Sequence, residues 1–304
     1  MPSYVNRSAV SPEERVTMLG LYQQGHSTIV IGRQLGRSGV CVAKHVKRAG
    51  GIIRNASRRV ARNEVKEDYF SSIDTPTKAY LLGLTYSDGN VYKNRYALRL
   101  QERDRQVLEL AKIEIGYTGT LYKQRRRKKN RQDLICLCVC RKEFVAHLLD
   151  KGVIPNKTSK LTFPTCVPEP LIVHFVHGLF DGDGCITLNR RVAKTGNTEL
   201  RCTVDIAGTR AVLEGVQRYF ITLGIEGKLY PCPTNVLSAR LKYRGLRSIR
   251  AVNHLYRNRQ HVFIRRKYLK YQSIVESFAD PHRYQCLSTR QTLDDAFSIL
   301  RSSP

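Results

Sequence analysis

The sequence of 304 residues is short of acidic side chains and has no long apolar segment. Aspartate and glutamate number 25 against 52 lysines and arginines, which gives a formal charge of +27. No apolar run reaches the ~18 residues of a membrane-spanning helix, and residues 1–10 lack the apolar core of a signal peptide. These absences argue against an integral membrane protein and against secretion. We expect a cytoplasmic, nucleoid-associated or organellar protein without a membrane partner.

The cysteine pattern also excludes a class of protein. Nine cysteines are an odd number and none form a Cys-x-x-Cys pair, so free thiols in a reducing compartment are expected rather than a disulfide framework. Cys136, Cys138 and Cys140 share one face of a predicted strand, and we interpret them as packing residues. His174 and His177 receive the same interpretation, as core or interface residues of the second matched segment.

The charge excess is carried by a chain that can fold. Hydrophobic residues make up 41% of the sequence, which is enough for a sizeable core. A strongly cationic folded protein most often has a polyanionic partner, and nucleic acid is the first candidate.

The N-terminal residues 1–52 contain three short predicted helices. Ser11 and Ser38 are typical N-cap residues for the first and the third, and glycines lie in the turns. Three short helices of which the last is basic are typical of an all-α helix-turn-helix domain, with a generic three-helix packing unit as the alternative. On the third helix, the predicted DNA contacts are Lys44, Lys47 and Arg48. Residues 53–73 are polar and basic and are predicted to be a linker.

Beyond residue 74 the sequence repeats itself. Segments 80–89 and 175–184 each place a glycine five positions before an Asp-Gly pair. Each is followed by two alternating strand-like stretches, a helical stretch, two more strands and a helix. The predicted divisions are a first repeat at 74–164, a second at 165–275 and a C-terminal tail at 276–304, whose one helical segment has no assigned role.

Cationic side chains share one face of the predicted strands, so two repeats side by side would form a basic saddle. A further basic run lies at a predicted hairpin tip, where a solvated loop or a localisation tag is the alternative to phosphate contact. The predicted DNA contacts are Arg95, Arg99, Gln101, Arg103, Arg125, Arg126, Arg127, Lys128 and Lys129 in the first repeat, and Arg201, Arg240 and Lys242 in the second.

The spacing of the small residues predicts that two acids lie close together. Gly83 with Ser87, and Gly178 with Gly182, form small-x-x-x-small pairs that let two helix backbones approach closely. The acids at the ends of these helices would then emerge near one another, at the negative end of each helix dipole. Such a pair is favourable if a divalent cation lies between the carboxylates, and oxygen ligands suit Mg²⁺. Taken singly, Asp88-Gly89 and Asp183-Gly184 are also ordinary turn formers.

The two matched segments resemble the signature helices of the LAGLIDADG homing endonucleases in their single-chain, two-repeat form. The resemblance runs from about residue 74 to 274 and includes Gly152-Val-Ile-Pro-Asn-Lys before the second signature and Arg266-Lys267 after it. It implies an α+β fold of two pseudo-symmetric αββαββα repeats, a pseudo-twofold interface between the signature helices, and a monomer that straddles a long asymmetric DNA site. The sixth signature position departs from the pattern, being Asp181 in one repeat and Tyr86 in the other, and is expected to cap or pack.

The resemblance also implies site residues. Asp88 and Asp183 would be the catalytic metal-binding acids, one for each strand cut, supported by the backbone carbonyls of Ser87 and Gly182. Basic side chains around the hydrolytic water vary in this family. The candidates here are Lys242, Arg240, Arg141 and Lys142.

The function predicted from these observations is a site-specific double-strand DNA endonuclease that uses Mg²⁺, either free-standing or encoded in a mobile intron. A non-catalytic DNA-binding regulator on the same fold is the alternative, although both acids are retained. An RNA maturase that binds intron RNA is a third possibility, because a basic saddle also accommodates structured RNA.

Overall fold

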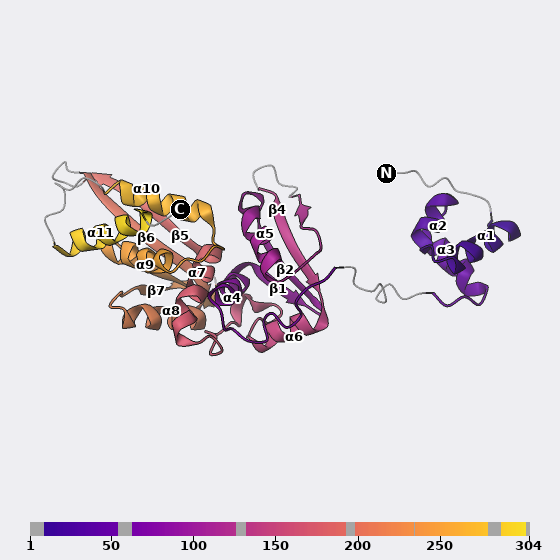
Figure 1. Cartoon of the computed structure of the whole chain (residues 1–304), viewed down its shortest axis with the longest axis horizontal. Helices are drawn as coiled ribbons and strands as arrows, with labels where there is room; N and C mark the ends of the chain where they lie inside the picture. The colour runs from indigo at the N-terminus through magenta and orange to yellow at the C-terminus, as the bar shows by residue number, and fades with distance from the viewer. Residues whose placement is uncertain are drawn as a thin grey trace. The chain divides into compact units, whose positions relative to one another are not determined.

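The computed structural model describes residues 9–53, 63–125, 132–192, 198–233, 235–278 and 287–301 (Figure 1). The chain divides into two compact units, Met1–Arg62 and Asn63–Pro304. No helix in the described ranges is both long and apolar enough to cross a membrane.

The first unit has three helices around a small core. They are α1 (Pro12–Gln23), α2 (Thr28–Gln34) and α3 (Gly39–Arg48). Ser11 caps α1 by accepting from the Glu14 amide at 3.2 Å, and Ser38 caps α3 in the same way. Gly36, at φ 62°, makes the turn between α2 and α3. The three predicted helices are therefore present.

The second unit consists of two repeats with the same order of elements, which confirms the predicted α+β fold. Each repeat has the order αββαββα, and further helices follow the second. The first repeat comprises α4 (Pro76–Asp88), β1 (Gly89–Tyr92), β2 (Arg95–Gln101), the short 3-10 turn η2 (Glu102–Asp104), α5 (Arg105–Glu114), β3 (Tyr122–Gln124), β4 (Leu134–Cys140) and α6 (Lys142–Asp150). The second comprises α7 (Ile172–Asp183), β5 (Gly184–Val192), β6 (Thr198–Thr209), α8 (Arg210–Thr222), β7 (Lys228–Cys232), β8 (Asn235–Arg244) and α9 (Leu246–Arg257). The 3-10 turns η3 (Lys157–Ser159) and η4 (Glu169–Leu171) lie between the repeats, and α10 (Arg265–Glu276) and α11 (Leu287–Arg301) follow them.

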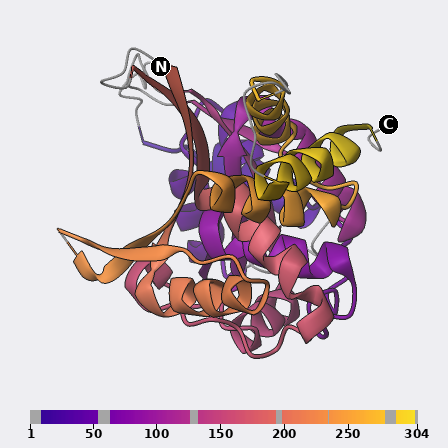
Figure 2. The same ribbon diagram turned by 90° about the vertical axis from the view of Figure 1, so that its left-hand side faces the viewer.

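Each repeat contains one antiparallel four-stranded sheet with helices on one face. The strand orders, β1-β2-β4-β3 and β5-β6-β8-β7, are equivalent. In the second sheet Val204, Ile206 and Leu241 are buried against α8 and α9. The alternating positions, Asp205 and Lys242 among them, lie on the opposite face. Figure 2 shows the helices gathered on one side of this sheet and the other side left uncovered.

The two repeats meet through α4 and α7, which lie side by side at the centre of the second unit (Figure 1). Both helices are buried on almost every side, as expected of a helix that is apolar all round. A Cβ on Gly83 would overlap the carbonyl oxygen of Phe175, and a Cβ on Gly178 would overlap that of Tyr80. The contact is therefore reciprocal and requires glycine at both positions.

The boundary between the two units differs from the predicted linker. Residues 63–73 were expected to be part of the linker, but Tyr69, Phe70 and Ile73 are buried in the core of the second unit. The Lys66 amide also donates to the Ile115 carbonyl at 2.9 Å. Three apolar side chains in a basic segment were enough to anchor it, which the overall composition of the segment concealed.

The C-terminal tail contributes to the second repeat. Helix α11 is longer than the expected segment and buries Leu293, Ala296 and Ile299. The Asn253 side chain on α9 donates to the Thr292 carbonyl at 3.0 Å. The tail therefore extends the core of this repeat.

We expect Gly83→Ala or Gly178→Ala to lower the free energy of unfolding by about 1–3 kcal/mol, because the added methyl group forces two packed backbones apart. Gly208→Ala is the matched control, since a Cβ there meets Leu213 no closer than 3.5 Å, and it should change stability by no more than about 0.5 kcal/mol. Urea denaturation followed by circular dichroism measures both. Wild-type stability in Gly178→Ala would contradict the close approach.

Candidate active site at the ends of the two central helices

The two matched acids are the last residues of the two central helices. Asp88 ends α4 and Asp183 ends α7. The Asp88 Oδ2 atom lies 2.8 Å from the point that a Cβ on Gly182 would occupy. That same Cβ would overlap the Ser87 side chain. The absence of a side chain at Gly182 therefore brings the Asp88 carboxylate against the backbone that precedes Asp183.

The surroundings of these carboxylates disfavour their charge. Burial, followed by the negative charge of Asp183, raises the pKa of Asp88 from 3.8 to about 6. Burial likewise raises the pKa of Asp183. Nearby Lys157 and Lys267 oppose both shifts. Two acids retained under such conditions are suited to share a divalent cation, which would compensate their charges.

Two lysines, half-buried Lys157 and buried Lys267, reach the same helix ends, and the sequence analysis did not assign them to the site. Lys157 Nζ donates to the carbonyls of Thr85, Tyr86 and Ser87 at 2.6, 2.5 and 2.9 Å. Cations at the C-terminus of a helix complement its dipole. Burial lowers the pKa of Lys157 to about 8.

Lys267 on α10 does the same for the second central helix. Its Nζ donates to the carbonyls of Phe180 and Gly184 at 2.7 and 2.5 Å, and to that of Gly182 at 3.5 Å. Burial lowers its pKa as well. The two lysines stand in Gly152–Lys157 and Arg266–Lys267, the segments that flank the second signature. Their position in these flanking segments was the sequence feature that could have assigned them to the site.

The predicted supporting carbonyls remain able to bind a cation. Ser87 and Gly182 each accept a hydrogen bond from one of these lysines, and a carbonyl oxygen has a second lone pair. The described part of the chain contains no group of three or more His, Cys, Asp or Glu side chains placed to hold a metal. A cation bound here would therefore need carbonyl, water or substrate oxygens besides the two carboxylates.

The sixth signature position packs inside the protein in both repeats. Asp181 is fully buried, and its Oδ2 accepts from the Tyr80 hydroxyl at 2.7 Å and from the Ile264 amide at 2.8 Å. Tyr86 donates through its hydroxyl to the Lys151 carbonyl at 2.8 Å. The helix interface is therefore asymmetric at this position.

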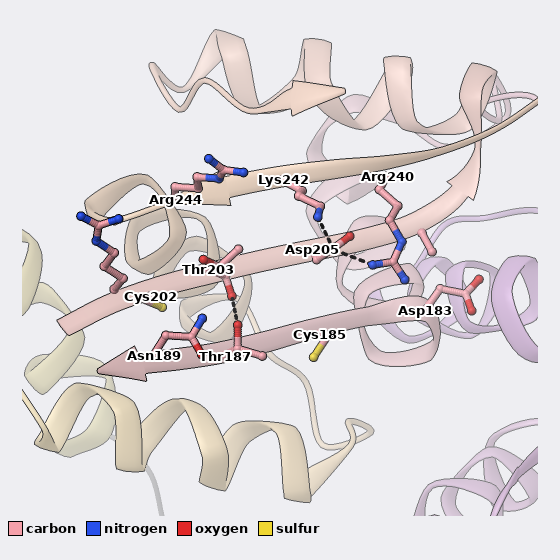
Figure 3. A pocket seen from close by; sticks show the side chains of 13 residues that line it. Asp183, Cys185, Thr187, Asn189, Cys202, Thr203, Asp205, Arg240, Lys242 and Arg244 are labelled. Atoms are coloured by element: carbon pink, nitrogen blue, oxygen red, sulfur yellow. Dashed lines mark hydrogen bonds and ion pairs between the residues drawn. The ribbon is translucent and has the colours of Figure 1, made fainter. Parts of the chain in front are cut away.

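A cavity of about 890 Å³ lies on the open face of the second sheet, beginning at Asp183. Figure 3 shows side chains of β5, β6 and β8 facing into it. Sequence reasoning named Arg201, Arg240 and Lys242 as contacts on this face, and it did not include several of their polar neighbours among the site residues. These neighbours are Cys185, Thr187, Asn189, Thr203, Asp205 and Arg244.

Residues 170–258, which include α7 and both strand pairs of this sheet, match the family described as a LAGLIDADG-like domain. The chain contains a LAGLIDADG-like domain. The first repeat shares its order of elements and its strand order with the matched region. No curated protein matches the sequence.

Several solved structures are similar to this protein. The meganuclease I-SmaMI bound to uncleaveable DNA with a TTCT central four is 13% identical, covering 74% of this chain and 97% of its own, with a TM-score of 0.48. The I-LtrWI LAGLIDADG homing endonuclease bound to target DNA is 12% identical, covering 78% and 98%, with a TM-score of 0.47. The LAGLIDADG meganuclease I-AabMI bound to uncleaved DNA is 13% identical, covering 75% and 97%, with a TM-score of 0.48.

The basic residues proposed to assist catalysis fall into two groups. Within the LAGLIDADG-like domain, Arg240 lines the cavity with Asp183, but its guanidinium pairs with Asp205 at 2.9 Å, as Lys242 does at 3.3 Å. In the first repeat Arg141 pairs with Glu67 at 3.0 Å. Lys142 is exposed as the first residue of α6. Arg141 therefore anchors the segment that enters the unit.

The other predicted DNA contacts are distributed over both units. In the first repeat, Arg95, Arg99 and Gln101 alternate along β2, and Arg95 donates to the Tyr122 hydroxyl at 2.8 Å. Arg103 lies in η2 instead of on the strand, and Arg125 is exposed just after β3. On α3 of the first unit, Lys44, Lys47 and Arg48 are exposed. Arg126, Arg127, Lys128 and Lys129 lie outside the described residues.

We expect Asp88→Asn to raise the melting temperature of the metal-free protein by a few degrees at pH 8. The pKa of this carboxyl is raised on folding, so its ionised form destabilises the protein above pH 6. The penalty disappears as the pH falls toward 3.8, and the gain should be absent near pH 4. Thermal denaturation in EDTA at both pH values measures it.

Asp205→Asn is the matched control for that prediction. Its carboxylate is paired with Arg240 and Lys242, and removing one negative charge from a chain of net charge +27 adds to the self-repulsion of the folded state. No gain is expected for Asp205→Asn. Equal stabilisation by both variants at pH 8 would contradict the assignment to Asp88.

Proposed function

We propose that this protein is a metal-dependent endonuclease that cuts both strands of one long double-stranded DNA site. The observation that carries the proposal is the meeting of Asp88 and Asp183 at the ends of two helices packed backbone to backbone. The resemblance of both signature segments to homing endonucleases supports the same function. Cationic side chains on the open sheet faces supply a surface for a polyanion.

The residues present fit a divalent cation such as Mg²⁺. The donors are oxygen atoms only, the pKa values of both acids are raised, and the Ser87 and Gly182 carbonyls stand beside them. When bound, Mg²⁺ supplies an activated water and stabilises the charge of the departing oxygen of a phosphodiester. Asp88 and Asp183 would hold the cation, one acid serving each strand.

Lys157 and Lys267 support this site in the proposal. Their ammonium groups fix the carbonyls that end α4 and α7, which orients the two acids. They also add positive charge where a phosphate anion would enter. Arg240 and Lys242 reach the same region from the sheet of the second repeat.

The first unit is proposed to be a second DNA-binding module. Its third helix, α3, is capped by Ser38 and exposes Lys44, Lys47 and Arg48. In helix-turn-helix proteins this helix enters the major groove. The module would add affinity and length to the site read by the saddle, because both belong to one chain.

The first test is cleavage of a randomised duplex library by the full chain with Mg²⁺, followed by sequencing of the broken ends. We expect one long motif with both strands cut, and no ends in EDTA. Asp88→Asn and Asp183→Asn should each lower double-strand cleavage at least about 100-fold, the scale of losing a main electrostatic contribution to a transition state.

Glu226→Gln is the control for the acid variants. This carboxylate is 74% exposed, and its ion pair with Arg247 is long, at 3.7 Å. Cleavage should therefore stay at the wild-type rate. Full activity in both aspartate variants would refute the assignment of catalysis to these two acids. Sequence-selective binding by a wild type that produces no ends would instead assign the protein to the regulators.

For the helix-turn-helix, we expect the double variant Lys44→Ala with Lys47→Ala to reduce the slope of log affinity against log salt concentration by about 2, since each lost phosphate contact removes about 0.9. Fluorescence anisotropy with a duplex of the selected motif, in EDTA, measures the slope. Lys270→Ala removes an exposed cation from α10 and should leave it unchanged. An unaltered slope in the double variant would remove α3 from the interface.

A further inference from the structure

One carboxylate stands among the cations of the open sheet face. Asp205 lies on β6 in the cavity of the second repeat, and its Oδ2 accepts from Arg240 Nη1 at 2.9 Å. Lys242 Nζ lies 3.3 Å from the same oxygen. Figure 3 shows both cations converging on Asp205, with Arg240 extending toward Asp183.

A carboxylate at this position opposes the binding of a polyanion. It repels phosphates and cancels part of the charge of two neighbouring cations. A surface that served only to attract DNA would bind more tightly without it. Asp205 is therefore expected to have a role on this face other than increasing the affinity for DNA.

The strand order indicates what Arg240 faces. It stands on β8, an interior strand in the order β5-β6-β8-β7. Its partner on β6 is Ala207, and the neighbouring residue of β6, Ile206, pairs with Gly184 on β5. Arg240 is therefore level with the end of α7, beside Asp183. On a sheet that lies in a groove, the side chains that reach base edges read the sequence, whereas contacts to the phosphates only position the protein.

We infer that Asp205 is a positioning residue that fixes the guanidinium of Arg240 to read a guanine next to the cleavage point. The inference rests on the proposed function, which places DNA on this face. A guanidinium held by a carboxylate presents its other donors in a fixed plane, and the O6 and N7 atoms of guanine accept two of them. The Arg240 side chain is 59% exposed, so these donors reach the cavity.

The carboxylate itself does not contact the DNA. The side chain of Asp205 is 18% exposed, and its Oδ1 is buried without a hydrogen-bond partner in the described residues. An acid that read a cytosine amino group would have to present an accessible oxygen. Its geometry instead suits the orientation of Arg240.

The test is a binding selection with the full chain, a randomised duplex pool and EDTA, so that it does not depend on cleavage. We expect the wild type to select guanine at one position near the centre of its motif. Asp205→Asn should reduce that preference by roughly 10-fold, within the range of one bidentate contact. Its affinity for a random-sequence duplex should rise about threefold, because one negative charge is removed.

Two variants make the result specific. Arg240→Gln should lose the same guanine preference while its affinity for the random duplex falls. Glu226→Gln removes an exposed charge from the same repeat and should keep the wild-type motif. The opposite changes in affinity separate a positioning residue from the residue that it positions.

Two outcomes overturn the inference. If Asp205→Asn keeps the full guanine preference and changes only affinity, the carboxylate does not position Arg240. If a cytosine preference disappears instead, the carboxylate contacts the base itself. If Asp205→Asn weakens the guanine preference as expected but the wild type produces no cut ends with Mg²⁺, the proposed nuclease function fails and the inference about Asp205 stands.

Discussion

The close contact of α4 and α7 is the constraint on which the site depends. Gly83 and Gly178 are each pressed against a carbonyl of the opposite helix, so neither helix can shift without a clash or a void. Because both helices end at an acid, their packing also sets where the two carboxylates stand. Stability of the core and placement of the acids are therefore the same property of this protein.

The charges at these helix ends are balanced by elements that lie outside both helices. Lys157 and Lys267 bring two ammonium groups near Asp88 and Asp183, and both lysines favour the charged form of these carboxylates. Each lysine is held by the carbonyls that a helix end leaves unpaired. A divalent cation would add positive charge to this site and attract phosphate. The same lysines thus stabilise the fold without metal and favour an anionic substrate with it.

The helices and strands of the two repeats could be predicted because residue spacing and strand alternation pointed to the same elements in both. Gly83 and Gly178 stand five residues before matched acids, and strand alternation placed Arg240 and Lys242 on the open face. Lys157 and Lys267 could not be assigned by spacing, since they reach the site from η3 and from α10, each far along the chain from the helix that it caps. The burial of Phe70 was missed for a related reason, because a few apolar contacts outweigh the polar composition of a short segment.

The two repeats share one topology but differ in size, and the difference bears on how DNA would be read. Strands β5 and β6 have 9 and 12 residues, whereas β1 and β2 have 4 and 7. At about 3.4 Å per residue, the second sheet extends considerably further along its strands. Asp205, Arg240 and the polar residues of β5 all stand on this larger face. A site read by such a saddle would be unequal about its centre, with more of its sequence recognised by the second repeat.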